Sequence, residues 1–199
     1  MPALWTDSID SHRHEVREAI LNAAAAQVAE QGLLSVTMAQ IAEATGIGRA
    51  TLYKYFPDVE AILSAWHDRE IGHHLQHLIT LRDQRGTIAQ RIEAVLAAYA
   101  MGSYQSRRHR ETELGAFLHR GERIADPARR LADLVRDLLA EGAKSGVIRT
   151  DVASADLASY CLHALAAARD VSSRAAVQKL VAVTVAGLRP AHRSRKGAP

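Results

Sequence analysis

Apolar residues recur every three or four positions through most of the chain, a spacing typical of helices that bury one face. No sustained alternation of apolar and polar residues, the pattern of a half-buried strand, is present. The valine-rich run 181–185 would suit a strand by composition, but it lies inside a helical stripe and is predicted to be helical. Only five prolines interrupt the chain. The pattern predicts an all-α protein of about nine helices.

The first two predicted helices are bounded by clear start and stop residues. An apolar stripe over 16–28 predicts a helix that ends at Gly32, because glycine readily adopts the left-handed backbone that follows helices. Thr37 and Gln40 then have the spacing of a capping box, in which each side chain satisfies a free N–H group of the first turn. A short second helix is expected to continue to about Thr45.

Similar signals mark the remaining helices. A third short helix over 49–56 ends at Pro57, and Asp58 is the expected N-cap of a longer fourth helix. Further helices are predicted after Gly86 with a Thr87–Gln90 capping box, over 111–119, from Asp126-Pro127 onward, over 154–169 and over 173–188.

The segment that joins the second and third helices has the features of a helix-turn-helix. Two helices that cross closely need a small residue at their contact and a turn residue that tolerates a left-handed backbone. Ala42 supplies the first and Gly46 the second. The apolar residues expected to be buried around them are Ile41, Ile47, Leu52 and Phe56. A unit of this kind can place its last helix in the major groove of DNA.

The third helix carries side chains suited to that role. Arg49 can donate two hydrogen bonds to guanine, and Thr51 offers a hydroxyl and a methyl group. Tyr53 and Lys54 suit phosphate oxygens, and the free N–H groups behind Thr37 suit another phosphate. The alternative is a plain helix hairpin without DNA binding. Spacing alone leaves both interpretations open.

Charge does not decide between these two interpretations. The formal net charge is +3, yet residues 1–60 contain four Lys or Arg against eight Asp or Glu. Much of the positive excess lies in the last eleven residues, and another basic cluster lies at 107–110. The DNA-binding hypothesis therefore depends on local geometry rather than on net charge.

The run TMAQIAEATGIGRATLYKYF, residues 37–56, closely resembles the DNA-binding domain of TetR/AcrR-family regulators, and the resemblance extends over about 16–66. The resemblance implies a homodimer that associates through its last two helices, about 154–188. It also implies a small-molecule effector, held by the middle helices, that releases a repressor from a near-palindromic double-stranded DNA operator. The two recognition helices would then reach successive major grooves, about 34–36 Å apart.

By position, the resemblance assigns six DNA-contacting candidates: Thr37, Arg49, Thr51, Tyr53, Lys54 and Tyr55. The chain departs from the family at the start of the fourth helix. The family usually has a lysine there that meets a phosphate, whereas this chain has Val59, so that contact is expected to be absent. Arg13 and Arg17 are then expected to matter more for phosphate binding.

Three segments follow from these features. We expect a DNA-binding helix-turn-helix domain over 1–57, in which 1–11 is disordered, and a ligand-sensing and dimerisation domain over 58–189. Residues 190–199 form a basic tail with too little apolar content to order itself.

The middle helices contain side chains that combine apolar bulk with a hydrogen-bonding tip, as ligand pockets do. The candidates for effector contacts are Trp66, Tyr99, Tyr104, Phe117, His119 and His163. His73 and His77 could share one helix face and bind a metal, but no nearby carboxylate or cysteine completes the set. No metal site and no cofactor are predicted, and the identity of the effector is left open.

Other function classes are disfavoured by the motifs that are missing. The sequence has no Gly-Lys-[Ser/Thr] phosphate loop, no Gly-x-Ser-x-Gly elbow and no set of Glu-x-x-His motifs for a di-metal centre, so an enzyme is not expected. Its one cysteine and its lack of a signal or of a membrane span of roughly 20 apolar residues predict a cytoplasmic protein. The expected function is DNA-binding regulation. The alternatives are a helical dimerisation module without sequence-specific DNA binding and a helical-bundle enzyme.

Overall fold

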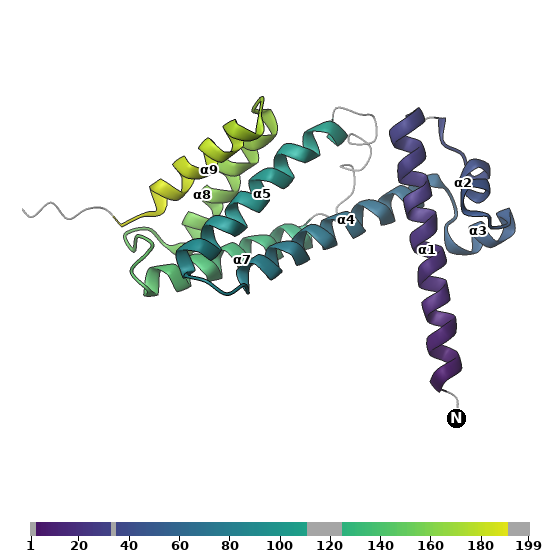
Figure 1. Ribbon diagram of the computed structural model, residues 1–199, viewed down its shortest axis with the longest axis horizontal. Helices are drawn as coiled ribbons and strands as arrows, with labels where there is room; N and C mark the ends of the chain where they lie inside the picture. Colours follow the sequence, from purple (N-terminus) through teal and green to yellow (C-terminus); the bar gives the residue numbers. More distant parts are fainter. Residues whose placement is uncertain (1–2, 33–34, 111–124, 191–199) are drawn as a thin grey trace, which may run out of the picture. The chain divides into compact units, whose positions relative to one another are not determined.

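The computed structural model describes residues 3–32, 35–110 and 125–190. Over these residues every regular element is helical, with eight α-helices and one short 3-10 helix (Figure 1). The all-α prediction is confirmed. The helix predicted over 111–119, with the candidates Phe117 and His119, lies outside the described residues, as does the tail from residue 191 onward.

The described residues divide into two compact units, one that runs up to Ile71 and another that contains 72–108 and the described residues from 125 onward. The division falls inside α4 (Val59–Arg82), whereas the sequence analysis placed a boundary just before this helix. The reason is that Ile62 and Leu63, in the first turns of α4, are fully buried in the core of the first unit.

The first unit is built from α1 (Ala3–Gln31), α2 (Met38–Thr45), α3 (Arg49–Tyr55) and the beginning of α4. These helices are coloured purple to blue in Figure 1. Their inward faces form one apolar core, whose buried residues are Ile20, Leu21, Ala24, Val28, Val36, Ile41, Ala42, Leu52, Phe56, Ile62 and Leu63. The predicted apolar stripe of the first helix therefore packs against α2, α3 and the beginning of α4 in a single cluster.

Helix α1 is longer than the sequence predicted. Disorder was expected over 1–11, whereas α1 begins at Ala3 in the structure. No glycine or proline occurs between Ala3 and Gln31. Once the packed part of α1 has formed, each further residue adds one hydrogen bond. The helix therefore extends towards its N-terminus as far as Ala3.

The second unit consists of the remainder of α4, α5 (Ile88–Arg110), α7 (Ala125–Lys144), α8 (Ser154–Ala166), η3 (Ala167–Asp170) and α9 (Arg174–Leu188). The predicted capping box before α5 is confirmed, because Gln90 N donates to Thr87 Oγ1 (3.3 Å) and Thr87 N donates to Gln90 Oε1 (2.9 Å). Ser173 caps α9 by accepting from Ala176 N at 3.2 Å. The valine-rich run 181–185 is helical, as predicted.

One predicted helix start is shifted. Asp126 was expected to cap α7 from outside, but α7 begins at Ala125, so Asp126 and Pro127 both lie in its first turn. The Asp126 carboxylate instead pairs with Arg129, one turn further along. An acidic group in the first turn still stabilises α7, because it opposes the positive end of the helix dipole.

The core of the second unit is formed by the apolar faces of all its helices, with Leu134, Val135, Leu138 and Leu139 of α7 among its buried residues. Cys161 lies in this core, and burial raises the pKa of its thiol to about 11. The thiol therefore stays protonated and unreactive near neutral pH. None of the described helices is long and apolar enough to cross a membrane.

Candidate nucleic-acid interface and pocket

The turn between α2 and α3 has the geometry that the sequence predicted. Thr37 Oγ1 accepts a hydrogen bond from Gln40 N (3.3 Å), and Gln40 Oε1 accepts one from Thr37 N (2.9 Å), which completes the capping box. Gly46 has the left-handed backbone, with φ 69° and ψ 15°. Its N–H donates to Glu43 O, and the next N–H, of Ile47, donates to Ala42 O. The turn is thus closed by backbone hydrogen bonds.

Helix α3 separates its residues between a buried and an exposed side. Leu52 is completely buried, and Phe56, which follows the helix, is 4% exposed. The polar residues predicted to contact DNA lie on the other side: Arg49, Thr51, Tyr53 and Lys54 are all exposed, Tyr53 to 55%. Tyr55 is half-buried and packs against the apolar core. The structure therefore presents four of the six candidates together on the open side of α3.

Thr37 is exposed, but its hydroxyl group is already engaged. Besides accepting from Gln40 N, Thr37 Oγ1 donates its hydrogen to Gln40 Oε1 at 2.8 Å. A hydroxyl has one hydrogen, so Thr37 has none left to offer to a phosphate. The N–H groups of Met38 and Ala39, in the first turn of α2, have no partner among the described residues and remain available to an anion.

Three side-chain contacts join the helices of the first unit. Gln27 Nε2 of α1 donates to Gln40 O of α2 (3.0 Å). The Arg17 guanidinium lies over the Phe56 ring, 4.7 Å from its centroid, in a cation–π contact that holds α1 against the end of α3. In the sequence analysis Arg17 was expected to contribute only a phosphate contact.

Arg69 provides the third contact and was missed by the sequence analysis. Its guanidinium donates to Glu18 Oε2 (2.5 Å) and to Asn22 Oδ1 (2.8 Å), and its side chain is 14% exposed. Since Arg69 belongs to α4 and both acceptors belong to α1, this arginine ties the two helices together. A planar guanidinium has several N–H donors, so it can form hydrogen bonds to acceptors on another helix at more than one position at once.

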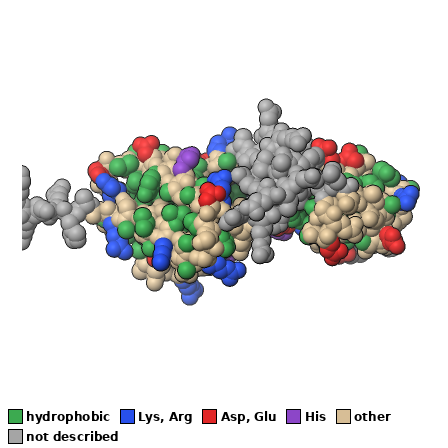
Figure 2. Space-filling view, turned by 90° about the horizontal axis from the view of Figure 1, so that it is seen from above, with side chains coloured by type: hydrophobic (Ala, Val, Ile, Leu, Met, Phe, Trp, Pro, Cys, Tyr) green, Lys and Arg blue, Asp and Glu red, His purple; other side chains and the backbone are tan. Residues whose placement is uncertain are grey.

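The surface of the first unit shows why net charge gave no support to DNA binding. Exposed carboxylates are present at Glu15, Glu30, Glu43, Asp58 and Glu60. On the face seen in Figure 2, acidic side chains are scattered over this unit. Val59, which stands where the family usually has lysine, is half-buried and packs against the core.

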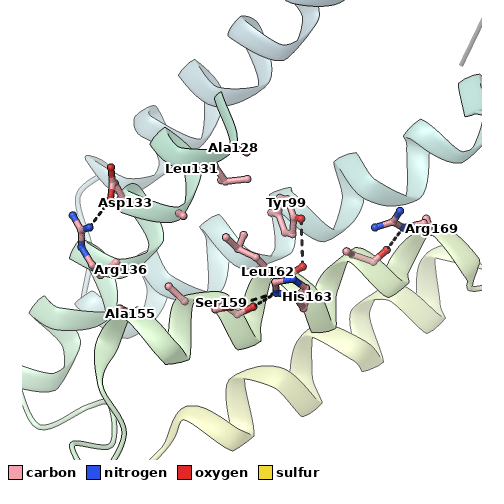
Figure 3. A pocket seen from close by; sticks show the side chains of 13 residues that line it. Tyr99, Ala128, Leu131, Asp133, Arg136, Ala155, Ser159, Leu162, His163 and Arg169 are labelled. Carbon is pink, nitrogen blue, oxygen red and sulfur yellow. Dashed lines mark hydrogen bonds and ion pairs between the residues drawn. The ribbon is translucent and has the colours of Figure 1, made fainter. Parts of the chain in front are cut away.

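The second unit contains an open pocket of about 480 Å³, formed by α5, α7, α8 and η3 (Figure 3). Of the effector candidates, Tyr99 and His163 line it. Trp66 packs against the core of the first unit, and Tyr104 packs against the core of the second without lining the pocket. The other lining residues, which the sequence analysis did not single out, are Ala128, Leu131, Ala132, Asp133, Arg136, Ala155, Ala158, Ser159, Leu162, Ala166 and Arg169.

Polar groups at the pocket bond to helix α8. Tyr99 Oη donates to Leu162 O at 3.3 Å. His163 Nδ1 lies 2.7 Å from Ser159 O, and because a carbonyl can only accept, this nitrogen carries the hydrogen. Arg169 Nε donates to Ala166 O at 2.7 Å. These bonds fix the side chains along one wall of the pocket, as Figure 3 shows.

The two arginines of the pocket differ in their surroundings. Arg136 pairs with Asp133 and with Asp137, the latter at 2.9 Å. Arg169 is paired with no carboxylate among the residues that the structure describes. The sequence contains a signal of this difference: Arg136 has an aspartate three positions before it, whereas no acid stands three or four positions from Arg169.

Three histidines of α4, at positions 73, 74 and 77, lie in different surroundings. His73 and His77 are exposed, and the ring of His74 packs against Gly102 of α5. Burial of His74, and next the charge of His77, lower the pKa of His74. Within the part of the chain that the structure describes, no three His, Cys, Asp or Glu side chains are grouped to hold a metal ion.

Comparisons with known proteins agree with this geometry. Residues 20–66 match the family model of bacterial regulatory proteins of the tetR family, and residues 92–190 match that of the SbtR-like transcriptional regulator C-terminal domain. An uncharacterized HTH-type transcriptional regulator of Mycobacterium tuberculosis is 32% identical over 88 residues, which are 44% of this chain and 47% of that protein. The match thus spans about half the length of this relative.

Solved structures share the fold at low sequence identity. A TetR/AcrR-family regulator from Thermobifida fusca has a TM-score of 0.74 and 19% identity, covering 87% of this chain and 98% of that one. FadR from Bacillus subtilis, in complex with stearoyl-CoA, has a TM-score of 0.60 and 17% identity, covering 86% and 99%. Since the two family models together match more than half of the residues, the chain belongs to the TetR/AcrR family of transcriptional regulators.

Proposed function

We propose that this protein is a DNA-binding transcriptional regulator that reads its operator with α3. The observation that carries this proposal is the arrangement of α3: its apolar side is sealed in the core of the first unit, and its polar side chains project from the opposite side. A helix held in this way can enter a major groove without disturbing its own packing.

In this proposal, some side chains of α3 contact bases and others contact phosphates. Arg49 is at the N-terminal end of the helix, where recognition helices contact base edges, and its guanidinium can form two bonds to guanine. Tyr53 lies one turn further along, so it shares a helix face with Arg49. Its hydroxyl and the Lys54 ammonium group are suited to phosphate oxygens, as is the open first turn of α2 behind Thr37.

The protein acts as a homodimer in this proposal, with α8 and α9 as the interface. The support is an exposed apolar surface on these two helices, where Tyr160 is 48% and Val183 is 67% exposed. Tyr160 and Gly187 are neighbours, because a Cβ on Gly187 would lie 3.6 Å from Tyr160 Oη. A second copy of the chain would cover this surface and place two α3 helices on the two halves of a near-palindromic site.

Release from the operator is assigned to a small molecule in the pocket of the second unit. Its volume of about 480 Å³ falls within the range of roughly 300–1,000 Å³ that small-molecule sites occupy. FadR from Bacillus subtilis, which shares this fold, was solved in complex with stearoyl-CoA, and this supports a small molecule as the effector here. The occupied protein would favour a conformation with lower affinity for DNA.

The test is a selection of DNA from a random pool with purified protein, followed by fluorescence anisotropy on the selected site. Arg49→Ala is expected to weaken binding about tenfold to hundredfold, because a bidentate contact to a base contributes about 1–3 kcal/mol. Tyr53→Phe is expected to weaken it less, through one lost phosphate bond. Arg85→Ala, which removes an exposed arginine from the second unit, is the matched control and should bind normally.

The same experiment separates the regulator from its alternatives. Sedimentation of the complex should show two protomers on each selected site, which should be near-palindromic. If no sequence is enriched, the helix-turn-helix is a packing motif and the chain is an interaction module. If a site is enriched but Arg49→Ala and Tyr53→Phe bind it like the wild type, α3 is not the reading helix.

A further inference from the structure

The pocket of the second unit is lined mainly by aliphatic side chains, most of them alanines. Seven of its thirteen lining residues are alanine or leucine: Ala128, Leu131, Ala132, Ala155, Ala158, Leu162 and Ala166. Alanine fills little space, so the pocket is wide where larger side chains would close it. Its volume of about 480 Å³ suits an apolar body of several carbon atoms. The walls alone would accept any hydrophobic molecule, so the polar groups must determine its chemistry.

Among the described residues, one positive charge at the pocket has no carboxylate partner. The Arg136 guanidinium is neutralised by Asp133 and Asp137, and Asp133 itself lines the pocket. Arg169 uses only its Nε–H, for the carbonyl of Ala166, and its terminal nitrogens meet no carboxylate of the described residues. Its side chain is half-buried, so this charge is partly removed from water. Burial of a guanidinium costs free energy unless an anion or water accepts hydrogen bonds from its remaining N–H groups.

The neighbouring polar groups do not replace that missing partner. Tyr99 Oη gives its hydrogen to Leu162 O, and His163 Nδ1 gives its hydrogen to Ser159 O. These hydrogens are therefore directed at the backbone of α8 rather than at a ligand. The carbonyls of α8 near its C-terminal end carry partial negative charge, and this charge by itself would favour a cationic ligand. Arg169 lies at this end and opposes that preference with a full positive charge.

We propose that the pocket binds an amphipathic carboxylate: an apolar chain lies along the alanine-rich wall, and its carboxylate pairs with the terminal nitrogens of Arg169. This inference rests on the proposed function, since it names the chemical class of the effector. A carboxylate fits because a guanidinium offers two parallel N–H donors to its two oxygens. An alcohol would leave the charge of Arg169 unpaired, and an amine would be repelled by it.

The experiment compares three probes with the same eight-carbon chain, which are octanoate, octanol and octylamine, by isothermal titration calorimetry on the full-length protein. Octanoate is expected to bind about tenfold more tightly than either of the others, the ratio of one partly exposed charge-assisted pair. Butyrate and dodecanoate extend the series, and affinity should rise with chain length because each added CH₂ is buried against the apolar wall.

Arg169→Met keeps an apolar stem and removes the charge, so it should abolish the preference for octanoate and leave weak binding of octanol unchanged. Arg169→Lys keeps the charge and should retain part of the preference. Arg174→Met removes an exposed arginine from the first turn of α9, outside the pocket, and should behave as the wild type. Circular dichroism of each variant checks that the helices are intact.

Several results would overturn the assignment. No binding of any carboxylate in the series, equal binding of octanoate and octanol, or tighter binding of octylamine would each exclude an anionic effector. A preference that survives in Arg169→Met would exclude Arg169 as its cause. These results are independent of DNA: if carboxylates bind but no operator is selected, the pocket assignment stands and the regulator proposal fails, and the reverse result keeps the regulator and removes the carboxylate.

Discussion

The two units use their helices in opposite ways. In the first unit, α2 and α3 close a tight turn over a small core, and side-chain bonds join α1 to α2, from Gln27 to Gln40, and α4 to α1, from Arg69 to Glu18. In the second unit, most ion pairs join residues close in sequence, such as Arg136 and Asp133, and the helices leave an open pocket between them. A surface that reads a rigid duplex needs fixed geometry, whereas a site that admits a ligand needs space.

The units also differ in the size of their cores. Among the described residues, eleven are buried in the core of the first unit and nineteen in that of the second. Each side chain of the smaller core therefore accounts for a larger share of its stability. The two clusters share no residue, although α4 contributes to both. The predictions below test whether the units can be disturbed separately.

The largest effect is expected from Leu52→Ala. Leu52 is completely buried between α3 and its neighbours, and truncation of a buried leucine costs about 2–5 kcal/mol. Hydrogen exchange should accelerate over α1 to α3 and operator binding should be lost, while α5 to α9 stay protected. Leu165→Ala, at an equally buried position of α8, should show the converse pattern. Uniform loss of protection in both variants would show that the units unfold as one.

A smaller effect is expected where the His74 ring of α4 packs against Gly102 of α5. A Cβ on Gly102 would lie 2.5 Å from His74 Cε1, so Gly102→Ala forces the imidazole to move and should destabilise the protein by about 1–3 kcal/mol. His74→Ala should relieve this cost in the double variant. Gly72→Ala is the control on α4, because its Cβ would meet no atom within 4 Å and alanine favours a helix. Urea denaturation compares the wild type with the two single variants, the double variant and the Gly72→Ala control, and additive changes in the free energy of unfolding would rule out the clash.

Two turn glycines, one in each unit, allow the effect of the same substitution to be compared between the units. Gly46 in the first unit and Gly146 in the second have φ of 69° and 73°, and a Cβ on either would meet no atom within 4 Å. Alanine at each position should cost about 1–2 kcal/mol through backbone strain alone. Only Gly46→Ala should also lower operator affinity, because it alters the turn before α3. Equal loss of DNA binding in Gly146→Ala would contradict this separation.

The smallest effect is expected from pH. The pKa of His74 is lowered in the folded protein by burial and then by His77, so the unfolded chain takes up this proton first as the pH falls. The contribution of neutral His74 to the free energy of unfolding should be fully present above the ordinary histidine pKa of about 6.5. It should decrease as the pH falls from there towards the pKa of His74 in the folded protein. His74→Phe should flatten this dependence in urea titrations, whereas His73→Gln, at an exposed position, should not.

Several features of the first unit could be predicted from the sequence because they are local. The Thr37 capping box, the left-handed Gly46 and the buried Leu52 each depend on residues within one or two turns. The length of α1 was underestimated because polar composition suggested disorder, although no residue there breaks a helix. Arg69 escaped because its partners stand about fifty positions earlier in the chain.

The pocket could be predicted only in part. Tyr99 and His163 were found by side-chain type, but Trp66 shares that type and packs in the core of the first unit. Whether a residue lines a cavity depends on how α5, α7, α8 and η3 meet, and the pattern within one helix does not contain this information. Arg169 was not predicted to line the pocket, although its lack of an acid three or four positions away is visible in the sequence.

The buried position of Cys161 makes the protein convenient for site-specific labelling. It is the only cysteine of the chain, and its thiol stays protonated near neutral pH. A maleimide dye would therefore react with a cysteine introduced at an exposed position, such as Lys54→Cys or Lys179→Cys, and leave the native one untouched. Fluorophores on α3 or α9 could then be placed without first removing a residue from the core.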